Sequence, residues 1–150
     1  MIEPLLHYEF YLEPKYVINL NRVTEGMNPK CFQKAKWGIW GAFLDMKRKV
    51  QKQTKEWILE NKIEPMPRQV REKFYVGNLK KSNRFDPVNY HTIEKPCIDT
   101  FVKEGILEDD NYMNIPEVTF LPLPQQPRKL YQFILEFYPY PFKETETDSN

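Results

Sequence analysis

The chain has 150 residues, a formal net charge of +1 and a hydrophobic content of 41%. These values predict one globular domain with a buried core and exclude an intrinsically disordered chain. No apolar run approaches the ~20 residues that a membrane-spanning helix needs, so we expect no membrane contact. Cys31 and Cys97 lie far apart with no CxxC motif, which indicates free thiols and a cytoplasmic location.

Charge is distributed unevenly along the chain. Residues 46–84 hold twelve Lys or Arg against four Glu, a net of +8, whereas residues 85–150 hold five against twelve, a net of −7. A charged, solvated helix followed by acidic loops would give this pattern. A phosphate-binding surface beside a cation site would give it equally well. Composition leaves both interpretations open.

The chain begins with two runs that favour strands. Aromatic and β-branched residues dominate Leu5–Leu12 and Tyr16–Leu20, and Pro14 separates the two runs. This pattern predicts a pair of strands at the start of the chain. Asn28-Pro29 then predicts the start of a helix.

Residues 30–62 are mostly good helix formers and predict a long helical segment. Trp37, Trp40 and Leu44 recur at three- and four-residue steps, which predicts a buried face for its first half. We expect the two tryptophans to lie in the core or in a dimer interface rather than to stack on bases. The more polar second half has three main apolar anchors: Val50, Trp57 and Ile58. One long helix or two consecutive helices would fit, and the length favours a break or a bend.

The next strand is predicted at Val70–Val76, closed by the turn chemistry of Gly77-Asn78. Two more strands are predicted at Tyr112–Phe120 and Leu130–Tyr138, joined by a proline-rich loop. With the intervening helices, this order predicts an α+β fold, a single compact domain with a mixed sheet and helices over residues 1–142. Residues 143–150 are expected to form a disordered acidic tail.

A helix predicted at Ile93–Lys103 has one apolar face and one charged edge. Pro96 is tolerable only in its first turn, and Gly105 is a natural C-terminal stop. At ~100° per residue its apolar side chains fill an arc of roughly 180°. Lys95 and Asp99 lie together just outside that arc, four residues apart on one edge of the helix.

Acidic residues flank this charged edge on both sides in the sequence. Asp86 precedes the helix, and Asp109 and Asp110 follow the turn beyond it. We expect these carboxylates to converge near Lys95 and to hold magnesium, which prefers oxygen ligands and can ionise a water beside a phosphodiester. Lys95 would add a fixed positive charge for the scissile phosphate. A turn residue, a surface ion pair and a solvated loop would explain the same residues without any metal.

The spacing D-x-x-N, K-x-x-x-D and G-[IL]-L-x-D-D over residues 84–115 resembles the core signature of the RusA family of Holliday-junction resolvases. The matching residues are Asp86, Asn89, Lys95, Asp99, Gly105, Asp109 and Asp110. About a fifth of the chain carries the resemblance. Elsewhere it is weaker, although Asn21 and the segment 34–40 stand about where the family has an Asn and a Lys/Trp-containing helix.

This resemblance implies a homodimeric, magnesium-dependent endonuclease that resolves four-way DNA junctions, with manganese expected to substitute. It implies that Asp86 and Asp110 bind the metal with Asp109 close by, and that Lys95 is catalytic. Asp99 would belong to the same acidic cluster, and Asn89 is a further candidate ligand. Two opposed strands must be cut in a four-way junction, which also favours a two-fold dimer. We expect no organic cofactor.

Val88 departs from the family pattern. The family writes its first element as D-x-D-N, whereas this chain has valine where the second carboxylate is expected. A valine side chain cannot bind a cation, so Asn89, Asp99 or Asp109 substitutes, or the site is weakened. The alternative function is therefore a catalytically weakened or inactive protein that binds branched DNA. A protein-interaction module with incidental acidic loops is a second rival.

Basic residues are predicted to contact the DNA backbone at two places. One group lies on the predicted long helix: Lys47, Arg48 and Lys52. The other lies in the loop before Asp86: Lys80, Lys81 and Arg84. Such contacts would give salt-sensitive binding with little base readout, although the helical group would also suit an ordinary solvated face.

Overall fold

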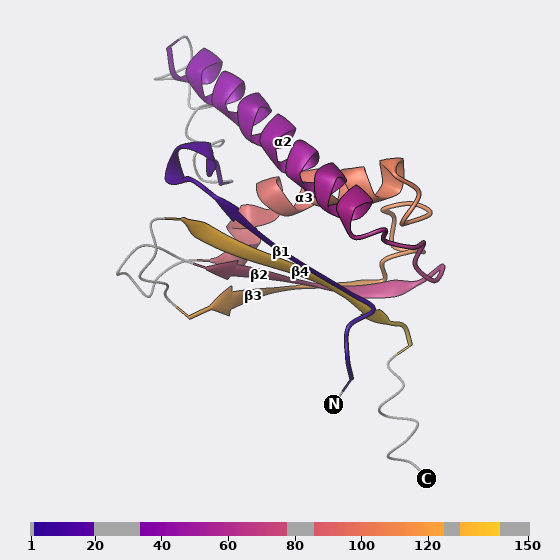
Figure 1. Ribbon diagram of the computed structural model, residues 1–150. Coiled ribbons are helices and arrows are strands. Elements are labelled where there is room, and N and C mark those ends of the chain that lie inside the picture. Colours follow the sequence, from indigo (N-terminus) through magenta and orange to yellow (C-terminus); the bar gives the residue numbers. More distant parts are fainter. Residues whose placement is uncertain (1, 20–33, 78–85, 125–129, 142–150) are drawn as a thin grey trace.

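The computed structural model describes residues 2–19, 34–77, 86–124 and 130–141 (Figure 1). The helix backbone is described from Lys34 and its side chains from Trp40. A single sheet forms one layer, and both α-helices lie on the same face of that sheet (Figure 1). This two-layer arrangement confirms the predicted α+β class with a mixed sheet.

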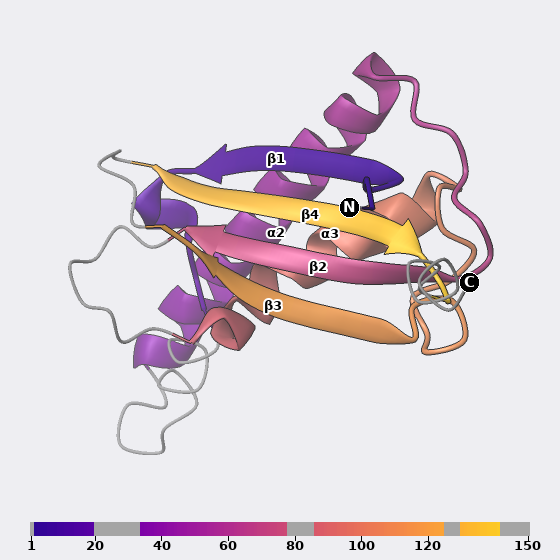
Figure 2. The same cartoon turned by 90° about the horizontal axis from the view of Figure 1, so that it is seen from below.

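The sheet contains β1 (Leu6–Leu12), β2 (Val70–Gly77), β3 (Glu117–Leu123) and β4 (Tyr131–Pro139). Their spatial order is β1-β4-β2-β3, so the last strand lies between the first two (Figure 2). β4 is antiparallel to both of its neighbours, whereas β2 and β3 are parallel. A parallel pair needs a crossover connection, and the chain between β2 and β3 supplies one through α3 (His91–Lys103).

The helices cover the sheet with regularly spaced apolar side chains. α2 (Lys34–Glu60) buries a side chain at every fourth position, a stripe formed by Met46, Val50, Thr54 and Ile58. α3 packs beside α2 and buries Ile93, Cys97, Ile98 and Phe101. Short 3₁₀ turns, η1 (Pro14–Tyr16) and η3 (Pro87–Tyr90), complete the described elements.

Aromatic rings fill the space between the layers. Phe74 and Phe133 stack at 5.8 Å, and Phe101 meets Phe137 edge-on at 5.5 Å. Polar groups within this core are linked to one another: the hydroxyls of Tyr8 and Thr54 lie 3.1 Å apart, and Thr54 contacts the Cys97 sulfur at 3.7 Å. Burial raises the pKa of the Cys97 thiol well above its ordinary value, which keeps this cysteine unreactive.

The predicted opening pair of strands is wrong. β1 forms as expected, but its partner is β4, and Tyr16–Leu20 is not a strand within its described residues. Pro14 begins a 3₁₀ turn instead, because its fixed φ suits the start of a turn. The third predicted strand begins at Glu117 rather than Tyr112 and continues to Leu123, into the segment expected to be a loop.

The long helix differs from the favoured expectation in two respects. α2 runs without interruption from Lys34 to Glu60, because its buried stripe continues over the sheet through the polar half. Trp40 is 52% exposed and stacks on Phe43 at 5.7 Å, so it lies outside the core of this chain. Its expected place in a dimer interface stays a prediction. The predicted anchors Val50 and Ile58 are buried, and Trp57 packs against Tyr8 at 4.6 Å. The proposed helix start at Asn28 and the side chain of Trp37 lie outside the described residues.

Glycine and proline behave differently from expectation at two positions. Gly77 belongs to β2 rather than to a turn, and a Cβ there would lie 3.1 Å from the Gln132 carbonyl oxygen of β4. Pro96 stands in the second turn of α3, where the helix forgoes one backbone hydrogen bond. Among the described residues, no helix combines the length and apolar content needed to cross a membrane. The tail at 143–150 lies outside the described residues.

Candidate active site

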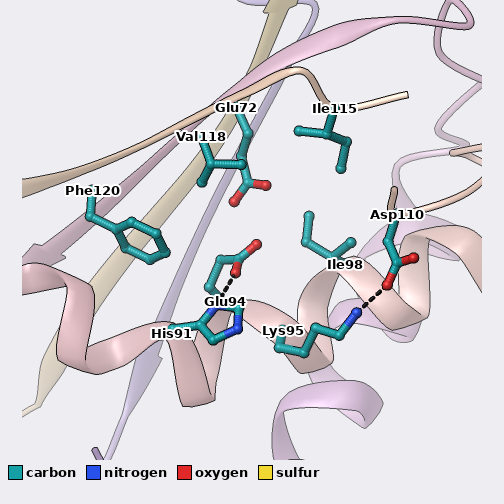
Figure 3. Close-up of a pocket in the computed structure, with 9 residues that line it drawn as sticks. All are labelled: Glu72, His91, Glu94, Lys95, Ile98, Asp110, Ile115, Val118 and Phe120. Atoms are coloured by element: carbon teal, nitrogen blue, oxygen red, sulfur yellow. Dashed lines mark hydrogen bonds and ion pairs between the residues drawn. The ribbon is translucent and has the colours of Figure 1, made fainter. Parts of the chain in front are cut away.

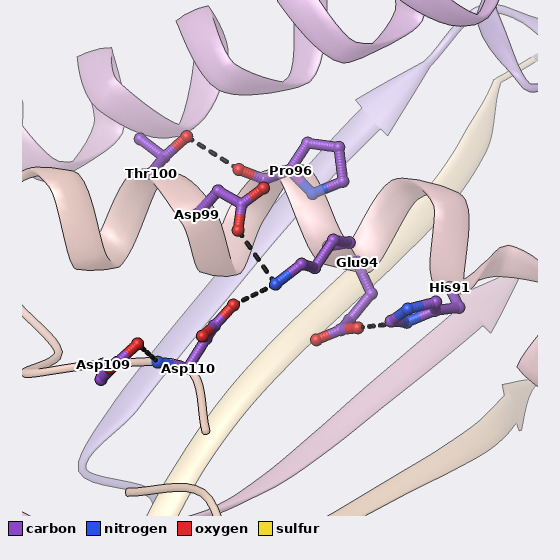
Figure 4. A network of polar contacts seen from close by, with 8 residues as sticks. His91, Glu94, Pro96, Asp99, Thr100, Asp109 and Asp110 are labelled. Atoms are coloured by element: carbon purple, nitrogen blue, oxygen red, sulfur yellow. Dashed lines mark hydrogen bonds and ion pairs between the residues drawn. The ribbon is translucent and has the colours of Figure 1, made fainter. Parts of the chain in front are cut away.

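The charged edge of α3 brings three of the predicted residues together. Lys95 Nζ lies 3.1 Å from the Asp99 carboxylate one helical turn away. It also donates to the Asp110 carboxylate, which reaches it from the loop after the helix (Figure 4). All three side chains are partly exposed, between 32% and 45%. The predicted convergence of Lys95, Asp99 and Asp110 is therefore confirmed.

The end of α3 explains how Asp110 arrives there. Gly105 has a φ of +78°, and the amide of Ile106 donates to the Phe101 carbonyl at 2.8 Å, which closes the helix with a reversed turn. Ile106 and Leu107 then enter the core, being only 4% and 3% exposed. These two anchors direct the chain back along the helix and place Asp110 beside Lys95.

The three charges stabilise one another in their ionised forms. The hydrogen bond from Lys95 lowers the pKa of Asp110 below its ordinary value. Burial alone would lower the pKa of Lys95, but its hydrogen bonds to Asp110 and Asp99 outweigh this effect and raise it. Lys95 is therefore a cation at neutral pH, available to an anion that displaces one of its carboxylates.

Asp109 is used to shape the loop. Its carboxylate accepts the backbone amide of Asp110 at 2.7 Å and the side-chain amide of Asn111 at 3.2 Å. Asn111 in turn accepts the amides of Met113 and Asn114. Asp109 thus holds Asp110 in place. Because Asp109 is exposed, its predicted role as a metal ligand stays open.

The residues of the predicted first metal-binding element stand at the start of η3. The Asp86 carboxylate accepts the amide of Val88 at 3.2 Å, and the amide of Asn89 donates to the Asp86 carbonyl at 3.0 Å. Val88 itself is 44% exposed. Within the described part of the chain, no three His, Cys, Asp or Glu side chains are grouped to hold a metal ion. The convergence of Asp86 with the other carboxylates therefore remains a prediction.

A pocket beside Lys95 contains two glutamates that the sequence interpretation missed. It has a volume of about 260 Å³ and lies between α3, β2 and β3. Figure 3 shows the carboxylates of Glu72 and Glu94 pointing toward each other inside it. Polar residues at its rim are His91, Lys95 and Asp110, and its walls are Ile98, Ile115, Val118 and Phe120.

Both glutamates occupy positions that periodicity assigns to the core. Glu72 is 0% exposed and shares the inward face of β2 with Val70 and Phe74. Glu94 is 4% exposed and lies in the middle of the apolar arc of α3, about 100° from Ile93. A charged residue at an inward position of a strand, repeated on a neighbouring helix, was the signal that could have identified them.

The two carboxylates differ in their partners. Glu94 Oε1 lies 2.8 Å from His91 Nδ1, and this hydrogen bond raises the pKa of His91 against the opposing effect of burial. No donor group among the described residues contacts either oxygen of Glu72. Burial raises the pKa of Glu72 well above its ordinary value, and so do the charge of Glu94 and a hydrogen bond with Glu94, which requires a proton on one of the two carboxyls.

Basic residues line a second pocket on the other side of Asp99. This pocket of about 310 Å³ lies between α2 and α3, and its lysines are Lys52, Lys55 and Lys103. Lys55 forms an ion pair with Glu104 at 3.7 Å. Arg48 is exposed and Lys47 half-buried on the same helix. The predicted contacts at Lys80, Lys81 and Arg84 lie outside the described residues.

Comparison with protein-family models and with curated proteins finds no match for this chain.

Proposed function

We propose that this chain is a magnesium-dependent, structure-selective DNA endonuclease of the RusA type that resolves four-way junctions as a homodimer. The observation that carries the proposal is the lysine at the charged edge of α3, held between Asp99 and Asp110 at the rim of the pocket that contains Glu72 and Glu94. The same three residues belong to the motif that resembles the RusA family, so residues matched in the sequence also lie together in space.

The candidate ligands fit magnesium in their chemistry. Asp110, with Asp86, Asp109 and Asn89, would offer carboxylate and amide oxygens, the ligands that this ion prefers. Bound magnesium would supply charge neutralisation on the phosphodiester and a more acidic water. The Asp110 side chain is about one-third exposed, so it is accessible to such an ion and to substrate.

Lys95 has a separate task in this proposal. Its amine is a cation held by two carboxylates, so a phosphate oxygen can replace one of them without any new charge being buried. The fixed ammonium would then stabilise negative charge that develops on the phosphate during cleavage. Asp99, one turn away, would keep the amine in place as a positioning residue.

The basic pocket between α2 and α3 supports a polyanionic substrate. Lys52, Lys55 and Lys103 meet Asp99 there, so the positive surface adjoins the edge that carries Lys95. Neutralising phosphates with such residues gives binding that weakens with salt and carries little sequence information. This route would bring a DNA backbone past the proposed catalytic lysine.

Asp110→Asn provides the test of this function. We expect the variant to lose cleavage of a labelled synthetic four-way junction in magnesium while retaining most of its junction binding in a gel-shift assay. Asp45→Asn is the matched control, since Asp45 is an exposed aspartate on α2 that lines neither pocket. Undiminished cutting by Asp110→Asn would refute the proposal.

A second candidate function is binding of branched DNA without cleavage. The exposed Val88 at a position where the family has a carboxylate favours it, as does the lack of a three-residue metal group in the described part of the chain. This candidate predicts salt-sensitive junction binding and no cleavage in magnesium or manganese. Val88→Asp separates the two: newly gained cutting identifies a weakened nuclease, and continued inactivity favours the binder.

A further inference from the structure

We propose that the buried pair Glu72 and Glu94 binds a divalent cation in the pocket between β2 and α3. This goes beyond the proposed function, since neither residue belongs to the resemblance and cation binding here does not require that the chain cut DNA. The site would be formed by a strand and a helix whose glutamates are 22 residues apart in sequence, and only the fold brings them together (Figure 3).

The first observation is an unpartnered carboxylate inside the protein. Glu72 is 0% exposed, and no donor group among the described residues contacts either of its oxygens. Leaving a buried polar group unsatisfied costs roughly 1–3 kcal/mol, and more for a charged one. A fold that retains such a group at a core position needs something to occupy the space in front of it.

The second observation is that the facing group is another carboxylate. Glu94 is 4% exposed and points at Glu72, so the pair cannot carry two negative charges in this apolar pocket without a counter-charge. Lys95 is the neighbouring cation that favours ionised Glu72, but Asp99 and Asp110 bind its amine. His91 holds Glu94 from the side and so orients its carboxylate.

The pocket suits a small, hard cation. Two carboxylates offer up to four oxygens, and magnesium or manganese is commonly held by one or two carboxylates with water at the remaining positions. A volume of about 260 Å³ leaves room for such waters, each of which occupies ~30 Å³ in the liquid. Apolar walls at Ile98 and Val118 strengthen the attraction between cation and carboxylates by lowering the local dielectric constant.

Manganese is the probe for this site. Binding of Mn²⁺ to the full-length chain, measured by calorimetry and by its electron paramagnetic resonance signal, should weaken at least ~10-fold in Glu72→Gln and in Glu94→Gln. Glu136→Gln is the matched control, because Glu136 is a buried glutamate of the same sheet whose oxygens contact His7 and Tyr138. It should leave Mn²⁺ binding unchanged.

The measurement is repeated in an Asp110→Asn background, which removes the central ligand of the proposed nuclease site. The carboxyl pair should still bind Mn²⁺ there, and Mn²⁺ should still raise the melting temperature unless Glu72 or Glu94 is also replaced. Failure of the wild-type chain to bind Mn²⁺ would overturn the inference, and so would binding by both glutamine variants that is as tight as that of the wild type. Loss of all binding in Asp110→Asn alone would also overturn it while leaving the nuclease proposal intact. Mn²⁺ binding by Glu72 and Glu94 in a chain that cleaves no junction would support the inference and refute the proposed nuclease function.

Discussion

Two histidine–glutamate pairs lie on opposite faces of the same sheet, and they differ in what the second carboxylate oxygen meets. On the face away from the helices, His7 Nδ1 lies 2.6 Å from Glu136, whose other oxygen accepts the Tyr138 hydroxyl at 2.8 Å. On the helix-covered face, His91 Nδ1 lies 2.8 Å from Glu94. There the carboxylate faces Glu72, which accepts no hydrogen bond from a donor group in the part of the chain that the structure describes.

The comparison indicates that His7–Glu136 is a structural pair, whereas the carboxyl group of Glu94 is available to bind a cation. Glu136 lies between donors on both sides, so its burial is compensated within the protein. Glu94 and Glu72 present like charges to each other in a pocket, and their compensation must come from a proton or from a cation. The same residue types thus serve stability on one face and candidate chemistry on the other.

The largest expected effect tests whether chemistry is confined to the helix-covered face. Lys95→Gln should reduce the rate of junction cleavage by about 10²–10³-fold, the usual cost of losing a group that stabilises charge in the transition state. Lys73→Gln is the matched control, since Lys73 lies over the Tyr138 ring on the other face. Equal losses in single-turnover assays of the two variants would break the comparison.

A smaller effect on stability is expected from the compensated pair. Glu136→Gln removes the charge that His7 and Tyr138 contact, so it should lower the free energy of unfolding by about 1.5–3 kcal/mol, the range for hydrogen bonds to charged groups. Urea unfolding followed by circular dichroism measures this. A neutral or stabilising result would show that Glu136 is not compensated by its neighbours.

Glu72→Gln should act in the opposite direction. The folded pKa of Glu72 is raised above the ordinary value of 4.5, so above that pH the native state holds a proton that the unfolded chain has released. Stability of the metal-free protein therefore falls as pH rises from 4.5 toward the raised pKa. The variant should be more stable than wild type by about 1 kcal/mol at neutral pH, with the advantage vanishing near pH 4.5. Urea titrations in a chelator from pH 4.5 to 8 check this, and a constant difference would contradict it.

The smallest effect concerns His91 itself. Its pKa is raised by the hydrogen bond to Glu94, so Glu94→Gln should move it downward toward the ordinary 6.5. A raised histidine pKa stabilises the fold at low pH, and this contribution is lost as pH rises through the folded value. Proton NMR of the imidazole resonances gives the shift, and the chain has only two histidines to assign. An unchanged His91 titration would mean that Glu94 does not control the ring.

The local features of the site were predictable from the sequence because they depend on periodicity. A four-residue step places Lys95 and Asp99 on one edge of a helix wherever that helix lies, and Gly105 ends it for reasons of backbone conformation. Asp110 was expected nearby because the turn is short. The role of Asp86 stays a prediction, since the described contacts do not connect it with Lys95.

The sequence by itself determined the fold class, strand β2, helix α3 and the charged edge that carries Lys95. Only the tertiary structure decided that β4 inserts between β1 and β2, that Trp40 faces solvent, and that Glu72 meets Glu94. The reason is physical: periodicity fixes which face of an element is apolar, but the partner of that face is chosen by burial summed over the whole chain. Glu72 and Glu94 each occupy a position where periodicity predicts an apolar residue, and the fold places both of them in one pocket.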